Sequence, residues 1–119
     1  MLSLDPDGGE TSPDAFHEFK VLGRTTVKDE VRRAVAAAVL KGVADSNGNV
    51  GRCFEPRHGL HVVYDGRVYD FVICFHCLQI RVFVGKGLLD TTPTTTSARK
   101  MITKVLKDAG VPVDASGKK

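Results

Sequence analysis

The sequence lacks any apolar run of the ~18–20 residues that a membrane-spanning helix requires. It also begins without the basic stretch and apolar core of a secretory signal peptide. We therefore expect no membrane span and, by default, a cytoplasmic protein. Export stays open as the alternative if the N-terminus is truncated.

Cysteine is scarce, with three residues at Cys53, Cys74 and Cys77. An odd number argues against a dense disulfide framework. One bridge with a free thiol, a metal site and three reduced thiols all remain open. A chain of 119 residues does not need disulfide bridges or metal sites to fold, because dependence on them is usual only below about 40 residues.

Positive charge is modest, with 17 basic and 14 acidic residues, and it is unevenly placed. Residues 1–19 carry five of the acidic residues and no lysine or arginine. This composition predicts an acidic flexible arm over residues 1–15, a single domain over 16–113 and a frayed tail over 114–119. No basic run or recognition-helix motif is present, so a protein or small-ligand partner is favoured over nucleic acid.

Hydrophobic spacing predicts an α+β domain. We expect a strand over 18–24, a helix that begins after a cap at Thr26 and continues to about Ala44, and a short strand over 50–54. A three-stranded meander follows over about 59–84, then a polar loop over 91–96 and a helix from about Ser97 to Ala109. The expected order is β-α-β-β-β-β-α, with the two helices covering an antiparallel sheet.

The meander has a predicted register. Asp65-Gly66 between two β-rich runs is typical of a two-residue hairpin turn, which sets His61 opposite Asp70. A second turn at Phe75-His76 would set Cys74 opposite Cys77 and keep one face apolar across all three strands. Phe-His is poor turn chemistry, so a bulge or a longer loop is the alternative.

The cysteines and one histidine form a candidate metal site. Cys53, His58, Cys74 and Cys77 supply the thiolates and the imidazole that zinc binds, with His76 as an alternative ligand. A zinc knuckle usually has a glycine that lets backbone amides reach the sulfurs, and no glycine lies between Val68 and Val84. The competing interpretation is that Cys53 and Cys74 are small buried hydrophobic residues.

Enzymatic chemistry has weaker support. A thioredoxin-like CxxC places its first thiol at a helix N-terminus, whereas strand periodicity follows Cys77. The same register predicts a row of His61, Asp70 and Arg81 on the polar face of the sheet, which we interpret as a surface charge ladder. No nucleophile is visible beside that row.

Two segments carry a family resemblance. Residues 53–59 (CFEPRHG) and 72–79 (VICFHCLQ) resemble a group of small, uncharacterised bacterial proteins that share CFxPRHG and [LV]ICFxCLQ segments. The resemblance implies one shared cluster from Cys53 to His58 and from Cys74 to Cys77, and it implies no activity. We therefore expect a non-enzymatic binding or interaction module with a structural or metal-binding Cys/His cluster. A thiol- or metal-dependent enzyme centred on Cys74 and Cys77, with His58 as base or ligand, is the alternative, and a weak nucleic-acid binder is a further one.

Overall fold

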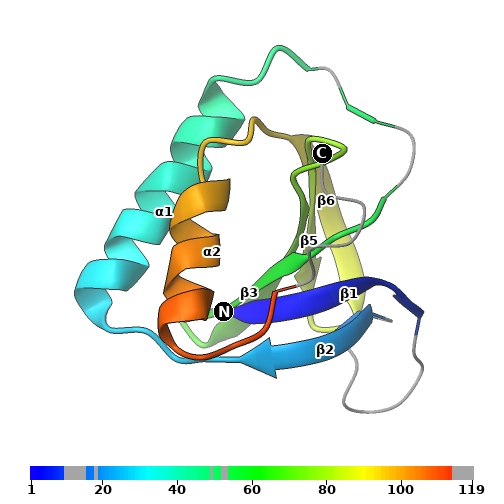
Figure 1. Ribbon diagram of the computed structural model, residues 1–119. Coiled ribbons are helices and arrows are strands. Elements are labelled where there is room, and N and C mark those ends of the chain that lie inside the picture. Colours follow the sequence, from blue (N-terminus) through cyan, green and yellow to red (C-terminus); the bar gives the residue numbers. More distant parts are fainter. Residues whose placement is uncertain (10–15, 18, 49, 52–53, 114–119) are drawn as a thin grey trace.

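The computed structural model describes residues 1–9, 16–17, 19–48, 50–51 and 54–113, and it shows an α+β fold (Figure 1). Six strands and two helices follow in the order ββαββββα: β1 (Leu2–Gly9), β2 (Phe19–Arg24), α1 (Asp29–Ala44), β3 (His58–Tyr64), β4 (Arg67–Cys74), β5 (Gln79–Val84), β6 (Gly87–Pro93) and α2 (Arg99–Asp108). The strands form one antiparallel sheet in the order β2-β1-β3-β4-β5-β6. No helix in the described part of the chain is long and apolar enough to cross a bilayer.

The predicted element order is corrected at its start, because β1 precedes β2 and lies within the segment interpreted as an acidic arm. Leu2, Ser3 and Leu4 are buried at 4%, 0% and 0% exposure, and β1 pairs with strands on both of its sides. Averaging charge over residues 1–19 hides this short apolar start. The segment forms a strand because Leu2, Ser3 and Leu4 are buried, and the average composition of the segment does not reveal this burial.

The first hairpin follows the predicted register. His61 lies opposite Asp70, Leu60 opposite Phe71 and Tyr64 opposite Arg67. Asp65 and Gly66 have φ values of 52° and 77°. Positive φ at both central residues defines the type I′ turn that Asp-Gly favours.

The second turn differs from its preferred prediction. Phe75 to Leu78 form a longer loop between β4 and β5, so that Cys74 lies opposite Gln79 and not opposite Cys77. Pairing is shifted by two residues, which preserves the face of every side chain because alternation along a strand has a period of two. The apolar pattern alone therefore could not separate the two registers.

Two other strand predictions are corrected. The described residues among 50–54 belong to no strand, and the polar segment predicted as a loop over 91–96 contributes to β6. Pairing with β5 decides this, since Thr91 and Thr92 lie opposite Arg81 and Ile80. β-branched threonine suits a strand at the edge of a sheet.

Both helices occur where spacing predicts them, and they lie on the same face of the sheet (Figure 1). Helix α1 begins after Lys28 with no side-chain cap, so the predicted Thr26 cap is wrong. Helix α2 directs Ile102 and Leu106 into the core at 0% exposure, and Gly110 follows it with a φ of 78°. A glycine in the left-handed region commonly terminates a helix.

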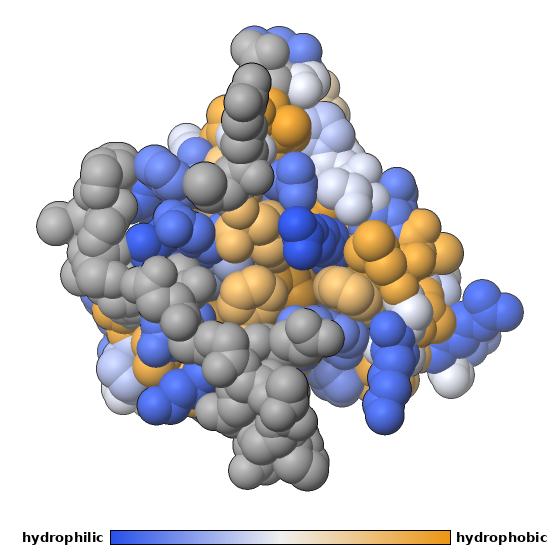
Figure 2. Space-filling model, turned by 90° about the vertical axis from the view of Figure 1, so that its right-hand side faces the viewer, coloured by the Kyte–Doolittle hydropathy of each residue, from blue (hydrophilic) through white to orange (hydrophobic). Residues whose placement is uncertain are grey.

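The sheet has an apolar cluster on each face. Residues from both helices pack against the first face together with Leu60, Ile73 and Ile80. Val72 alternates with Ile73 along β4 and therefore lies on the second face, where it packs with Leu2, Leu4 and Phe16. Figure 2 views the molecule from the side away from the helices, where apolar surface alternates with hydrophilic side chains. The candidate functional groups lie in the loop between β4 and β5 and on the sheet face away from the helices.

Candidate functional site

The turn between β4 and β5 holds two buried thiols. Cys74 and Cys77 are free cysteines with 0% and 2% exposure. The backbone N–H of Cys77 donates to Cys74 Sγ at 3.1 Å, and Cys77 Sγ lies 3.8 Å from the Cys74 carbonyl oxygen as a weak donor. Cys74 and Cys77 therefore contact each other within the loop that joins β4 to β5, and they do not lie opposite each other on paired strands.

The hydrogen bonds at this turn favour a thiolate on Cys74. The Cys77 side chain contributes most, and the backbone N–H groups of Cys77, Glu55 and His76 add to it; together they lower the pKa of Cys74 to about 6 against the opposing effect of burial. The pKa of Cys77 is raised, chiefly by its hydrogen bond to Cys74 and then by burial. The two thiols therefore titrate as a coupled pair, in which loss of the first proton is favoured and loss of the second is opposed.

Leu78 explains how the backbone reaches this sulfur without a glycine. Its φ is 58°, in the left-handed region that costs a non-glycine residue about 1–2 kcal/mol. The residue after the second cysteine thus adopts a conformation for which glycine would be the usual choice. The absence of a glycine argues against a zinc knuckle, but Leu78 adopts the backbone conformation that the glycine would otherwise provide.

A second segment lies against the thiol turn. The Gly51 N–H donates to the Cys77 carbonyl at 2.6 Å, and a Cβ added at Gly51 would lie 2.9 Å from Cys77 Cβ. Cys53, the third predicted thiol ligand, lies outside the described residues. His76, the alternative ligand, is exposed at the tip of the turn.

His58 faces a different environment from the thiols. It is 4% exposed, its Nε2 hydrogen-bonds with Thr103 Oγ1 of α2 at 2.9 Å, and its ring meets Phe75 edge-on at 5.2 Å. Burial, followed by the charges of Arg99 and Arg57, lowers the pKa of His58 to about 4. Within the described residues, no three side chains among His, Cys, Asp and Glu come together as metal ligands.

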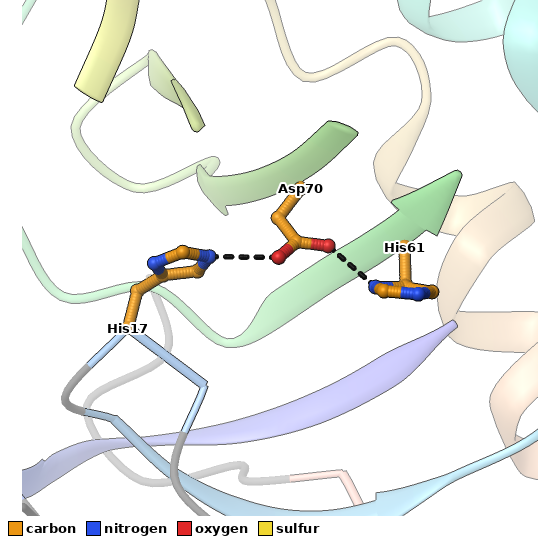
Figure 3. Close-up of polar contacts among 3 residues, drawn as sticks. All are labelled: His17, His61 and Asp70. Carbon is orange, nitrogen blue, oxygen red and sulfur yellow. Dashed lines mark hydrogen bonds and ion pairs between the residues drawn. The ribbon is translucent and has the colours of Figure 1, made fainter. Parts of the chain in front are cut away.

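A separate polar cluster lies on the sheet face away from the helices (Figure 3). Asp70 Oδ1 accepts a hydrogen bond from His61 Nδ1 at 2.6 Å, and its Oδ2 accepts one from His17 Nε2 at 2.8 Å. The side chains of Asp70 and His17 are 12% and 13% exposed, whereas His61 is 51% exposed. His17 also stacks on Phe83 with 3.9 Å between ring centroids.

This cluster corrects the predicted surface row. His61 lies opposite Asp70 as the register predicts, but Asp70 is buried, and Phe83 occupies the position opposite Asp70 that the predicted register gives to Arg81. The Arg81 guanidinium instead lies 3.8 Å above the Phe54 ring, within the range of a cation–π contact. Pairing rules could not identify His17, because it lies 53 residues from Asp70 and outside the meander.

The fold and the two polar clusters define a small α+β domain with an antiparallel sheet, helices on one face and a buried thiol pair at one turn. No protein-family model, curated protein or solved structure matches this chain. We therefore infer the function from the geometry of the chain itself.

Proposed function

We propose that this protein is a non-enzymatic binding module in which Cys74 and Cys77 bind a soft metal ion, with zinc as the first candidate. The observation that carries the proposal is the hydrogen bond that the backbone N–H of Cys77 donates to the buried Cys74 Sγ at 3.1 Å. Metal ions bind thiolates and not thiols. A turn that stabilises a thiolate before metal arrives lowers the cost of binding.

Because Cys74 is buried, a negative charge on its sulfur needs a stabilising partner. A thiolate with 0% exposure is poorly solvated, so its charge requires either hydrogen bonds or a cation. The backbone supplies the former, and a divalent cation bound between the two sulfurs would supply the latter. Zinc binding would also deprotonate Cys77, whose pKa is raised by its hydrogen bond to Cys74 and by burial.

Zinc normally takes four ligands, and the described residues offer two of them at this turn. His58 is already engaged by Thr103. Cys53 remains the candidate for a third ligand, since it follows Gly51 and precedes Glu55, whose backbone groups both contact the thiol turn. Solvent or a partner would complete the coordination.

The enzyme alternative uses the same two sulfurs. A thiol whose pKa is lowered forms its thiolate more readily, which suits thiol chemistry as well as metal binding. Both sulfurs are buried, however, and a nucleophile must meet its substrate. Metal binding is favoured because an ion is small enough to enter a site that excludes a larger substrate.

The test is the metal content of protein purified without a nickel column. We expect about one zinc ion per chain in the wild type, because each chain carries one Cys74–Cys77 pair. Cys74→Ser and Cys77→Ser should each lose that zinc. His76→Ala is the matched control, because His76 lies in the same turn but is exposed, and it should retain the wild-type content.

Titration of thiols in unfolded protein separates the remaining outcomes. Three reactive thiols without zinc would refute the metal site. One reactive thiol without zinc would indicate a disulfide and favour the thiol-dependent alternative. Loss of zinc in Cys53→Ser would identify the third ligand.

A further inference from the structure

The cluster of His17, Asp70 and His61 is separate from the thiol turn and takes no part in the proposed metal site. Figure 3 shows the Asp70 carboxylate between the two imidazole rings. Its Oδ1 accepts from His61 Nδ1 at 2.6 Å, and its Oδ2 accepts from His17 Nε2 at 2.8 Å. The carboxylate is therefore held in place at both of its oxygens.

The hydrogen bond to Asp70 sets the tautomer of His61. An ionised carboxylate can only accept hydrogen bonds, so the proton of a neutral His61 ring lies on Nδ1. The lone pair of the ring then lies on Nε2, the nitrogen that does not contact Asp70. An imidazole nitrogen with a lone pair can act as a nucleophile.

The two imidazoles of the cluster differ in their access to solvent. The side chain of His61 is 51% exposed, whereas that of His17 is 13% exposed and stacks on Phe83 with 3.9 Å between the ring centroids. Within the described residues, His61 makes no hydrogen bond other than the one to Asp70. A reagent in solution can therefore reach His61, and His17 anchors the carboxylate behind it.

Asp70 also stabilises the charge that a reaction at His61 Nε2 creates. Attack by Nε2 on an electrophile leaves the imidazole ring positive. The Asp70 side chain is only 12% exposed, so water screens its negative charge poorly. A carboxylate behind a histidine orients the ring and stabilises its positive form in this way.

Charge and apolar surface select the class of electrophile. The negative charge of Asp70 repels anionic phosphoryl donors. Val63 follows His61 by two residues in β3, so both side chains lie on the same face of the sheet, and Val63 is 66% exposed. Exposed apolar surface next to the ring suits the hydrocarbon part of an acyl group.

We propose that His61 Nε2 is an acceptor of acyl groups from activated esters or thioesters. The Nε2 lone pair forms a bond to the acyl carbon, the bond from that carbon to the leaving oxygen or sulfur breaks, and the leaving group departs with the bonding electrons. The positive ring, stabilised by Asp70, then loses its Nδ1 proton to solvent and becomes a neutral acylimidazole. This reaction does not depend on metal binding at the thiol turn.

The test is the reaction of the full chain with p-nitrophenyl acetate at about pH 8, where imidazoles are neutral. Release of nitrophenolate should accompany formation of an acylimidazole, which is followed by its ultraviolet absorbance. The initial rate of acylimidazole formation should fall at least about tenfold in His61→Gln. His76→Ala, which removes an exposed histidine from the β4–β5 loop, should stay within about twofold of the wild type. Equal rates in the wild type and His61→Gln would overturn the proposal.

Asp70→Asn tests the positioning role of the carboxylate. The rate should fall at least about tenfold, because an amide can donate to Nδ1 and move the ring proton to Nε2. Nitrogen NMR of the His61 ring should show this change of tautomer, and a slower reaction with an unchanged tautomer would refute the role.

Cys74→Ser separates this reaction from acylation of the thiols. The variant should form the acylimidazole at the wild-type rate, and a loss would assign the reaction to the thiol turn and refute the proposal. Nitrophenolate release without an acylimidazole would mean that His61 activates water instead, and it would also refute the proposal.

Discussion

Acidification should destabilise this protein through His58. The imidazole is 4% exposed, and its pKa is lowered to about 4 by burial and by the charges of Arg99 and Arg57. In the unfolded chain the same group titrates near its ordinary value of 6.5. Between these two pH values the unfolded chain binds a proton that the folded chain does not. The free energy of unfolding therefore decreases as the pH falls.

The magnitude follows from proton linkage. Each pH unit across this window changes the free energy of unfolding by about 1.4 kcal/mol. The window extends from 6.5 down to about 4, which gives a loss of about 3 kcal/mol. The stabilisation is fully present above pH 6.5, decreases as the pH falls and reaches its minimum below pH 4. A loss of this size is a large fraction of the ~5–15 kcal/mol stability of a typical domain.

Urea denaturation at a series of pH values measures this effect. His58→Gln keeps a hydrogen-bonding group for Thr103 but does not titrate. Between pH 7 and 4, its free energy of unfolding should therefore fall by about 3 kcal/mol less than that of the wild type. His76→Ala removes an exposed histidine and should keep the wild-type profile. Identical profiles for His58→Gln and the wild type would refute the reasoning. NMR titration of the His58 ring provides an independent check through its midpoint.

Three further perturbations test the packing. Asp70→Ala removes the carboxylate that accepts from two imidazoles, and it should cost about 2–3 kcal/mol in urea denaturation because the partly buried imidazole of His17 loses its partner. Ile102→Ala at 0% exposure should lower the free energy of unfolding by about 2–5 kcal/mol, whereas Leu40→Ala at 69% exposure should change it by less than about 0.5 kcal/mol. Gly51→Ala places a Cβ 2.9 Å from the thiol turn and should lower the melting temperature, whereas Gly87→Ala, whose nearest neighbour would lie 3.7 Å away, should not. Equal effects within either matched pair would contradict this packing.

The sequence by itself determined the local elements of this protein. Asp65-Gly66 specified the first hairpin and its register, because only a few residue pairs tolerate positive φ at both turn positions. Helical spacing located α1 and α2 within a few residues, since an amphipathic helix must repeat its apolar face every turn. The His61–Asp70 pair followed from the hairpin without further information.

Tertiary structure alone decided the remaining features. β1 and β6 are strands because neighbouring strands pair with them, and their own sequences resemble an arm and a polar loop. The Cys74–Cys77 loop depends on Leu78 in a conformation that leucine disfavours by itself. His17 reaches Asp70, and His58 reaches Thr103, across 53 and 45 residues of chain. Contacts between residues so distant in sequence depend on how the whole sheet and its helices assemble, and no local pattern records them.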